Sequence, residues 1–140
     1  MKIFLICAHL FFVNIIFAQN CKEFQIGIYT NENPFGKMII EREGDFQLEK
    51  TVDNSTIYLQ KIEKISECEY RLKRYKVISL GRLPEPNMKE LVSVKITNVN
   101  GDNFEYKAQL VGTELTIKGN FIKISQDISD EFKKIIEYER

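Results

Sequence analysis

The sequence predicts an all-β protein, in which an eight-stranded antiparallel up-and-down meander closes into a barrel and a C-terminal α-helix follows it. Three observations lead to this prediction. Apolar and polar residues alternate with period two along most of residues 22–124. Short turn sequences join these segments, which makes consecutive strands antiparallel neighbours. Eight strands are enough to close a barrel without exposed edges. The alternatives are a two-sheet sandwich and a half-open barrel with the helix plugging one mouth.

In the first half of the domain, the alternation of apolar and polar residues predicts four strands separated by turn-forming residues. These strands are expected at residues 24–29, 38–42, 46–49 and 56–65. Turn formers occupy residues 31–36, 43–45 and 53–55 between them. In the fourth strand the apolar phase shifts between Leu59 and Ile62, which indicates a bulge or a bend.

The second half of the domain predicts four more strands. They are expected at residues 70–80, 91–99, 104–110 and 115–124. The longest loop, residues 81–87, contains two prolines that each remove a backbone donor. Asn100-Gly101 predicts a two-residue hairpin, because both residue types tolerate positive φ. Gly119 predicts a bend in the last strand.

The pattern becomes helical at the C-terminus. Ile128, Phe132, Ile135 and Ile136 share one face of a helix expected over about residues 128–138. Asp127 or Ser129 is expected to cap its N-terminus. We expect this helix to pack on the core of the domain.

Residues 1–18 have the features of a secretory signal peptide. Lys2 gives a positive start, residues 3–17 are almost wholly apolar, and Ala18 is a small residue before the expected cut. An apolar run of about fifteen residues is shorter than the roughly twenty that a membrane span needs. The alternatives are an uncleaved N-terminal anchor and a lipoprotein processed at Cys21. We expect an exported protein, periplasmic or secreted, with no membrane span after cleavage.

Removal of residues 1–18 from the 140-residue chain leaves a single domain of 122 residues, 19–140. This domain has 19 basic and 20 acidic residues, so its net charge is near −1. A balanced charge gives no electrostatic case for a nucleic-acid partner. The sequence gives no indication of the oligomeric state.

Two of the three cysteines remain in the domain, because Cys7 belongs to the signal peptide. In an oxidising compartment Cys21 and Cys68 are expected to pair. The strand count supports pairing, because it places both at the same end of the barrel. The alternative is two separate buried thiols. Two cysteines without a histidine do not complete a zinc site, so no metal and no cofactor are expected.

The sequence also resembles a group of exported proteins. The residues that carry the resemblance are Cys21–Tyr29, Ile39–Arg42, Gln47–Glu49 and Glu67–Leu72. They resemble small, largely uncharacterised proteins of Bacteroidota over most of residues 21–124. Such proteins are sometimes labelled as a DNA topoisomerase IV subunit, but a 122-residue domain has no room for a DNA-cleavage domain. The resemblance implies no catalytic or binding residues. The architecture is similar to lipocalin-like and fatty-acid-binding-protein-like barrels, although Gly27-Ile28-Tyr29 replaces their Gly-x-Trp signature.

The chain is not expected to be an enzyme. Its single histidine, His9, lies in the signal peptide, which removes the commonest catalytic base. The glycines are scattered and form no phosphate-binding loop. The carboxylate pairs Glu41/Glu43 and Glu67/Glu69 share strand faces, and we interpret them as surface charge. The basic residues within 71–76 are likewise interpreted as one solvated strand face.

Two functions are consistent with these features. The first is an exported binding module that holds an apolar or amphipathic small molecule inside the barrel. The second is a non-catalytic structural or protein-interaction domain of the cell envelope with a filled core. The partner is then a small apolar ligand or an envelope protein. The predicted lining of the barrel is Phe24, Ile26, Ile28, Phe46, Leu48, Ile57, Leu59, Tyr106, Leu110, Leu115 and Ile117.

Overall fold

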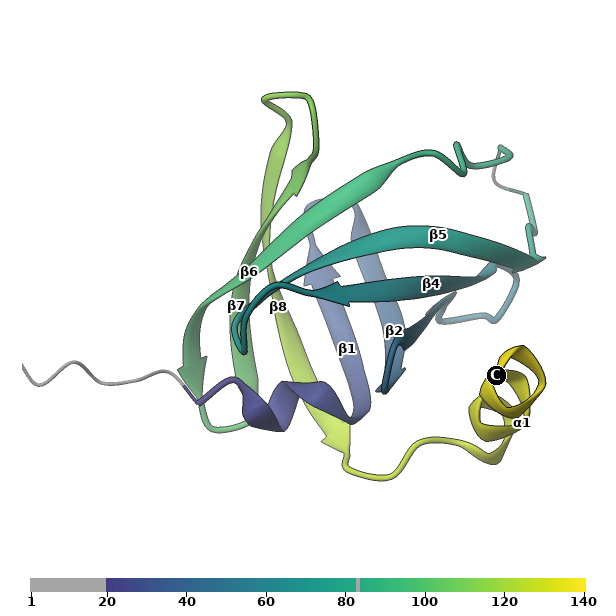
Figure 1. The fold of residues 1–140 in the computed structure, drawn as a ribbon, viewed down its shortest axis with the longest axis horizontal. Coiled ribbons are helices and arrows are strands. Elements are labelled where there is room, and N and C mark those ends of the chain that lie inside the picture. Colours follow the sequence, from purple (N-terminus) through teal and green to yellow (C-terminus); the bar gives the residue numbers. More distant parts are fainter. Residues whose placement is uncertain (1–19, 83) are drawn as a thin grey trace, which may run out of the picture.

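The structure is a computed structural model that describes residues 20–82 and 84–140. Eight antiparallel strands close into a barrel in the order β1 to β8, and a helix follows the last strand (Figure 1). The predicted fold class is confirmed. The predicted signal peptide, residues 1–18, lies outside the described residues.

The elements follow the predicted order with longer strands. Their bounds are η1 Lys22–Gln25, β1 Gly27–Asn33, β2 Gly36–Glu43, β3 Phe46–Thr51, β4 Ile57–Lys64, β5 Glu69–Ser79, β6 Leu91–Asn100, β7 Asn103–Leu110, β8 Thr116–Ser125 and α1 Asp130–Glu139. The Asn100-Gly101 hairpin forms one residue later than predicted. Asn100 pairs with Asn103, so Gly101 and Asp102 make the turn and only Gly101 of the two has positive φ, 58°.

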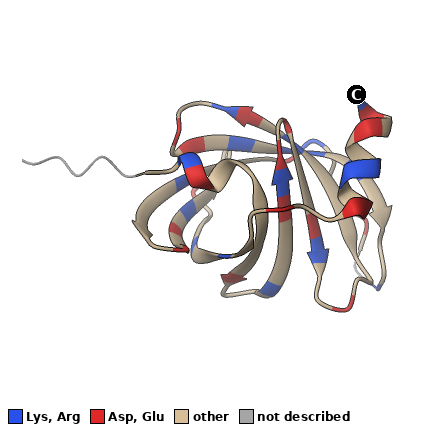
Figure 2. Ribbon diagram, turned by 90° about the horizontal axis from the view of Figure 1, so that it is seen from below, with Lys and Arg blue, Asp and Glu red and all other residues tan. Residues whose placement is uncertain are grey.

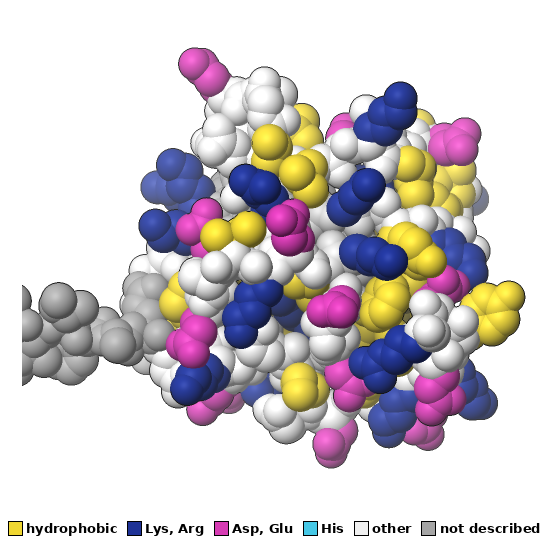
Figure 3. Space-filling view, viewed as in Figure 1, with side chains coloured by type: hydrophobic (Ala, Val, Ile, Leu, Met, Phe, Trp, Pro, Cys, Tyr) yellow, Lys and Arg dark blue, Asp and Glu magenta, His cyan; other side chains and the backbone are white. Residues whose placement is uncertain are grey.

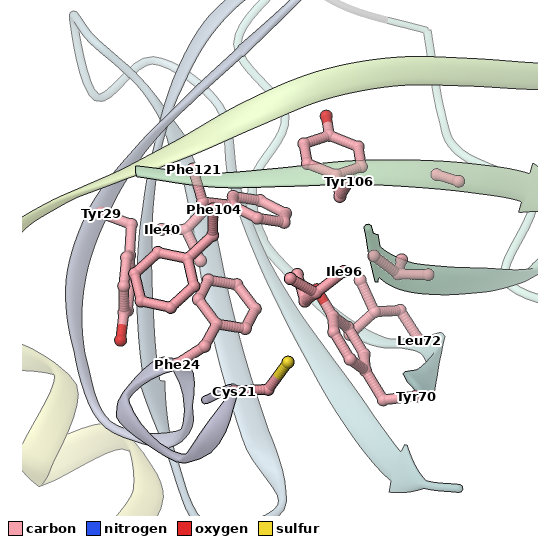
Figure 4. Close-up of a cluster of buried hydrophobic side chains, with 12 residues drawn as sticks. Cys21, Phe24, Tyr29, Ile40, Tyr70, Leu72, Ile96, Phe104, Tyr106 and Phe121 are labelled. Carbon is pink, nitrogen blue, oxygen red and sulfur yellow. The ribbon is translucent and has the colours of Figure 1, made fainter. Parts of the chain in front are cut away.

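One end of the barrel is closed by the short helix η1, and we call it the closed end. The sequence pattern predicted a strand from Phe24, but residues 22–25 form a 3-10 helix instead. Phe24 fills the barrel end and is 1% exposed. Its ring lies 4.7 Å from that of Tyr29, 5.2 Å from Phe104 and 4.6 Å from Phe121, measured between centroids (Figure 4). This aromatic packing overrides the local period-two pattern.

A disulfide holds η1 on the closed end. Cys21 immediately precedes η1, and Cys68 lies in the turn between β4 and β5. The two residues are bonded with a Cα–Cα distance of 5.2 Å and are 47 residues apart in sequence. The predicted pairing is therefore confirmed. Cys21 is fully buried beside the Phe24 cluster, so the bridge ties the end plug directly to the sheet.

The C-terminal helix α1 packs on the outside of the barrel, over β3 and β4 (Figure 1). This contact forms a second hydrophobic core, separate from the one inside the barrel. Its buried members are Phe46, Leu48, Leu59, Ile128, Phe132 and Ile136. The strands β3 and β4 are therefore apolar on their outer face, where a solvent-facing strand would be polar.

A buried carboxylate fixes the start of α1. The hydroxyl of the N-cap residue Ser129 accepts a hydrogen bond from Phe132 N at 3.2 Å. Glu41 of β2, 1% exposed, accepts hydrogen bonds from Ser129 N at 2.9 Å and from Ser129 Oγ at 3.0 Å. Lys50 Nζ lies 3.3 Å from Glu41 Oε1. The interpretation of Glu41 as surface charge is therefore wrong, because α1 covers it.

We expect Glu41→Ala to lower the free energy of unfolding by about 2 kcal/mol, because it removes two hydrogen bonds to a buried charged group and leaves Lys50 unpaired. Urea denaturation followed by circular dichroism measures the change. Glu105→Ala, on an exposed position of β7, is the control and should change stability by less than about 0.5 kcal/mol. Equal stability of the two variants would contradict this account of the helix anchor.

The phase shift in β4 has a different cause from the one predicted. Register shifts do occur between β4 and β5, but their additional residues, Tyr75 and Ile78, belong to β5. The side chains of β4 itself alternate regularly. Leu59 packs under α1, whereas Ile62 packs in the barrel core, so the apolar pattern changes because the buried face changes.

Gly119 is required for a close approach, while the bend expected at this residue stays a prediction. The strand runs through it without a register shift, and Gly119 pairs with Tyr106 of β7. A Cβ at this position would lie 2.6 Å from Tyr106 Oη and 2.6 Å from the carbonyl oxygen of Glu32. The missing side chain lets Tyr106 cross the strand and donate a hydrogen bond of 2.7 Å to Asn31 Oδ1.

Candidate functional site

The end of the barrel opposite η1 contains a cavity, and we call this end the open end. The cavity has a volume of about 500 Å³. Every strand contributes to its wall. The lining residues are Asn31, Asn33, Phe35, Gly36, Met38, Ile40, Gln47, Glu49, Tyr58, Gln60, Leu72, Arg74, Val92, Val94, Tyr106, Ala108, Ile117 and Phe121. Phe35, in the turn between β1 and β2, is 80% exposed and lies at its rim.

The cavity has two chemically different walls. The wall on β3, β4 and β5 is largely polar, with Gln47, Glu49, Tyr58, Gln60 and Arg74 beside the apolar Leu72. The wall on β6, β7 and β8 is largely apolar, with Val92, Val94, Ala108, Ile117 and Phe121. In the closed eight-stranded barrel β3 and β4 lie across from β7 and β8, whereas β6 adjoins β5. The cavity is therefore amphipathic.

Four inward polar side chains form one lateral row across β2 to β5. Arg42 pairs with Gln47, Gln47 with Gln60, and Gln60 with Arg74 in the strand register. We call these four residues the polar row. Arg42 Nη1 donates to Gln47 Oε1 at 2.9 Å, and Gln47 Nε2 donates to Gln60 Oε1 at 3.2 Å. The row begins and ends with a guanidinium group.

Arg42 is a buried cation between the cavity and the end plug. It is 1% exposed, and its guanidinium carbon lies 4.3 Å from the ring centroid of Phe24 and 4.2 Å from that of Tyr70. Such stacking stabilises a desolvated cation. Arg42 Nε and Tyr70 Oη are buried without a hydrogen-bond partner among the described residues. Burial raises the pKa of Tyr70 to about 12, against the opposing effect of the Arg42 charge, so the phenol remains neutral.

Glu49 is the acidic residue of the cavity wall. Burial raises the pKa of its carboxyl group, while the Arg74 charge and a hydrogen bond from Gln60 act in the opposite direction. The chain of hydrogen bonds from Arg42 through Gln47 and Gln60 ends at Glu49. Because its pKa is raised, the Glu49 carboxyl group takes up a proton more readily than a carboxyl group in water.

The pairing between β5 and β6 has a gap beside the cavity. These strands pair only from Glu69↔Lys95 to Lys73↔Leu91, so β5 continues for six residues beyond the start of β6, and the two ribbons diverge (Figure 1). Arg74 is the first residue beyond this pairing. Its Nε lies 3.8 Å from Glu90 Oε2, in the residue that precedes β6. The interpretation of Arg74 as part of a solvated face is wrong, because it lines the cavity at this gap.

The structure places the predicted lining residues in several different environments. Tyr106 and Ile117 line the cavity. Phe24 lies at the closed end. The side chain of Ile28 points to the opposite face of β1 from that of the lining residue Asn31. Their role in ligand binding stays a prediction.

The prediction of an inward position is wrong for most of the other residues. Phe46, Leu48, Ile57 and Leu59 pack on the outer face under α1. Ile26 is 41% exposed, and Leu115 is 58% exposed in the turn before β8. Leu110, at the end of β7, is half-buried and is not among the lining residues. The period-two pattern located the strands, but it did not identify which face was interior.

Sequence reasoning missed the polar row. Part of the signal was present, because Arg42 shares its strand phase with Met38 and Ile40, and Arg74 shares its phase with Tyr70 and Leu72. Gln47 and Gln60, in contrast, occupy the polar phase of their strands. That phase was assigned to solvent, since polar residues usually face water. The position of α1 shows that in β3 and β4 the polar side chains face the interior, because α1 covers the apolar side chains on the outside.

The outer surface carries mixed charges. Basic and acidic residues are interspersed around the barrel, without a large region of one sign (Figure 2). Hydrophobic side chains gather near α1 and the end of β5 (Figure 3). The exposed members there include Ile78 and Tyr138, which line a shallow groove with Val77 and Ile135.

Neither a membrane helix nor a metal site is found in the part of the chain that the structure describes. No helix within residues 20–82 and 84–140 has the length and apolar character to cross a membrane. Over the same residues, no group of three or more His, Cys, Asp or Glu side chains is arranged to hold a metal ion.

Comparison of the chain with protein-family models, with curated proteins and with solved structures found no match. The resemblance to exported Bacteroidota proteins therefore stays a prediction, and the functional argument rests on the geometry of the barrel.

Proposed function

We propose that this protein is an exported, non-catalytic binding module whose barrel holds a small amphipathic molecule in the cavity at its open end. The observation that carries the proposal is the cavity itself. Its volume of about 500 Å³ lies within the 300–1,000 Å³ range typical of small-molecule sites. A polar wall opposite an apolar wall suits a ligand that has both a head group and an apolar part.

Two further features support this proposal over an envelope domain with a filled core. The pairing between β5 and β6 ends beside the cavity, so the barrel wall is not continuously hydrogen-bonded where Arg74 lines it. Arg42 and the two glutamines place polar groups in the interior at an energetic cost that apolar side chains would avoid. The disulfide is consistent with an oxidising compartment.

A cavity-filling variant tests the proposal. Ala108 lines the apolar wall and is buried, so Ala108→Phe places a ring in the space assigned to the ligand. We expect it to weaken binding of N-phenyl-1-naphthylamine, a neutral fluorescent amphiphile, at least tenfold. Fluorescence titration measures this. Lys107→Phe, at the neighbouring exposed position of β7, adds the same ring outside and should leave the affinity unchanged.

Folding is checked by circular dichroism, because overpacking costs about 1–3 kcal/mol. If Ala108→Phe does not fold, Val92→Phe at the half-buried start of β6 replaces it. A wild-type protein that binds no amphiphile, or an Ala108→Phe variant that binds as well as wild type, would contradict the proposal. Native mass spectrometry of protein purified from its source cells then seeks the natural ligand.

A further inference from the structure

We propose that the cavity selects amphiphiles with an anionic head group, and that the polar row on β2 to β5 binds this head group. This inference rests on the proposed function and specifies its ligand class. It follows from the charges, the free hydrogen-bonding groups and the position of the polar row.

The interior charges favour an anion. The polar row contributes two guanidinium groups, Arg42 and Arg74, and no carboxylate. Among the lining residues of the cavity, Glu49 is the only acidic one. Glu90, outside this lining, forms a salt bridge with Arg74 (Nε–Oε2 3.8 Å) and offsets part of its charge. The polar row and the cavity lining together still carry two positive charges, Arg42 and Arg74, against the one carboxyl group of Glu49, and a ligand anion would balance them.

The hydrogen-bond direction along the row leads to the same conclusion. The side-chain oxygens of Gln47 and Gln60 already accept hydrogen bonds from their neighbours in the row. The donors that remain toward the cavity are chiefly those of the Arg74 guanidinium, because the Gln60 amide also donates to Glu49. A carboxylate or sulfonate accepts from such donors, and its hydrogen bonds to a guanidinium are among the strongest in proteins. An ammonium group offers only donors; its one anionic acceptor among the lining residues is Glu49, and the guanidinium groups of the row would repel it.

The geometry also places the apolar part of the ligand. A head group on the polar row sits next to the gap between β5 and β6, because Arg74 lies at that gap. The apolar chain then extends along the apolar side of the cavity, where Val92 and Val94 of β6 and Ile117 of β8 lie.

Glu49 makes anion binding depend on pH. Its carboxyl group faces Arg74 and Tyr70 of β5, Tyr58 and Gln60 of β4, Tyr106 of β7, and Arg42 through the two glutamines. Burial raises the pKa of Glu49. Protonation removes the negative charge nearest to the ligand anion, so anion affinity rises as the pH falls through the pKa of Glu49.

Three ligands with one chain and fixed charges test the selectivity. They are decane-1-sulfonate, 1-decanol and decyltrimethylammonium, compared by competition against N-phenyl-1-naphthylamine at low ionic strength. Because none of them titrates near neutral pH, any pH dependence comes from the protein. We expect the sulfonate to bind about ten- to hundredfold more tightly than the alcohol, which is the effect of one or two charged hydrogen bonds. The cation should bind most weakly.

Matched variants assign the effect to the row. Arg74→Gln should weaken sulfonate binding at least tenfold without changing decanol binding, whereas Lys73→Gln, at the exposed neighbouring position, should change neither. Glu49→Gln should strengthen sulfonate binding and remove its pH dependence. Glu63→Gln, exposed on β4, is the control for that charge change.

The outcomes separate this inference from the proposed function. If the alcohol or the cation binds as tightly as the sulfonate, the anion site is wrong and the binding module stands. The same conclusion follows if Arg74→Gln and Lys73→Gln give equal sulfonate affinities. If neither the naphthylamine nor any of the three ligands binds, the proposed function itself fails.

Discussion

Cys68→Ser is expected to lower the free energy of unfolding under oxidising conditions by about 4 kcal/mol. Cys21 and Cys68 are 47 residues apart in the sequence, and the bond between them closes the intervening chain into a loop. The chain-entropy model gives a stabilisation of about 4 kcal/mol for a loop of that length. The bond also holds the Phe24 plug on the closed end. For a domain of this size we expect the melting temperature to fall by about 10–20 °C. Differential scanning calorimetry measures the shift.

The reducing condition is the control for this effect. In the presence of a thiol reductant that breaks the bond, the wild type and the variant should melt at similar temperatures. The double variant Cys21→Ser/Cys68→Ser, which has no free thiol in the domain, should behave like the single variant under both conditions. An unchanged melting curve for Cys68→Ser without reductant would contradict a stabilising role for the bond.

Arg42→Ala is expected to cost about 3.5–5 kcal/mol of stability. It removes the buried cation from between the rings of Phe24 and Tyr70, and it leaves Gln47 Oε1 without its donor. Stacking on desolvated rings is worth about 2 kcal/mol, and a hydrogen bond from a charged group about 1.5–3 kcal/mol. Urea denaturation gives the loss, and near-ultraviolet circular dichroism reports whether the aromatic cluster remains ordered.

Arg42→Met separates the packing of this side chain from its charge. Methionine fills much of the same volume without a buried charge, and such replacements of buried ions can be close to neutral. We expect Arg42→Met to cost less than half as much as Arg42→Ala, and Arg82→Ala, at an exposed position, to cost less than about 0.5 kcal/mol. An Arg42→Ala variant as stable as Arg82→Ala would show that the stack adds nothing.

Much of the fold follows from local patterns in the sequence. Turn formers such as Glu43-Gly44-Asp45 and Asn100-Gly101 separate the strands near their observed ends. The spacing of Ile128, Phe132 and Ile136 predicted α1, and all three are buried against β3 and β4, although α1 begins at Asp130, after Ile128. These predictions succeeded because strand alternation and helix periodicity are properties of neighbouring residues.

The candidate site was harder to predict, because it depends on which face of each strand turns inward. Phe46 and Leu48 were assigned to the interior as the apolar phase of β3, but they lie under α1. Gln47 and Glu49 then necessarily face the cavity, since successive side chains of a strand point to opposite faces. A strand that is covered on both sides has no solvent face to reveal its orientation.

The sequence alone determined that this protein is an eight-stranded meander with a terminal helix and that Cys21 and Cys68 can meet at one end. Tertiary structure alone decided that Phe24 leaves its strand to plug the barrel, because only the assembled rings of Tyr29, Phe104 and Phe121 offer it a place. It also decided the polarity of the cavity. The docking of α1 buries the apolar side chains of β3 and β4 on the outside, and this leaves Gln47, Gln60 and their two arginine neighbours to the interior.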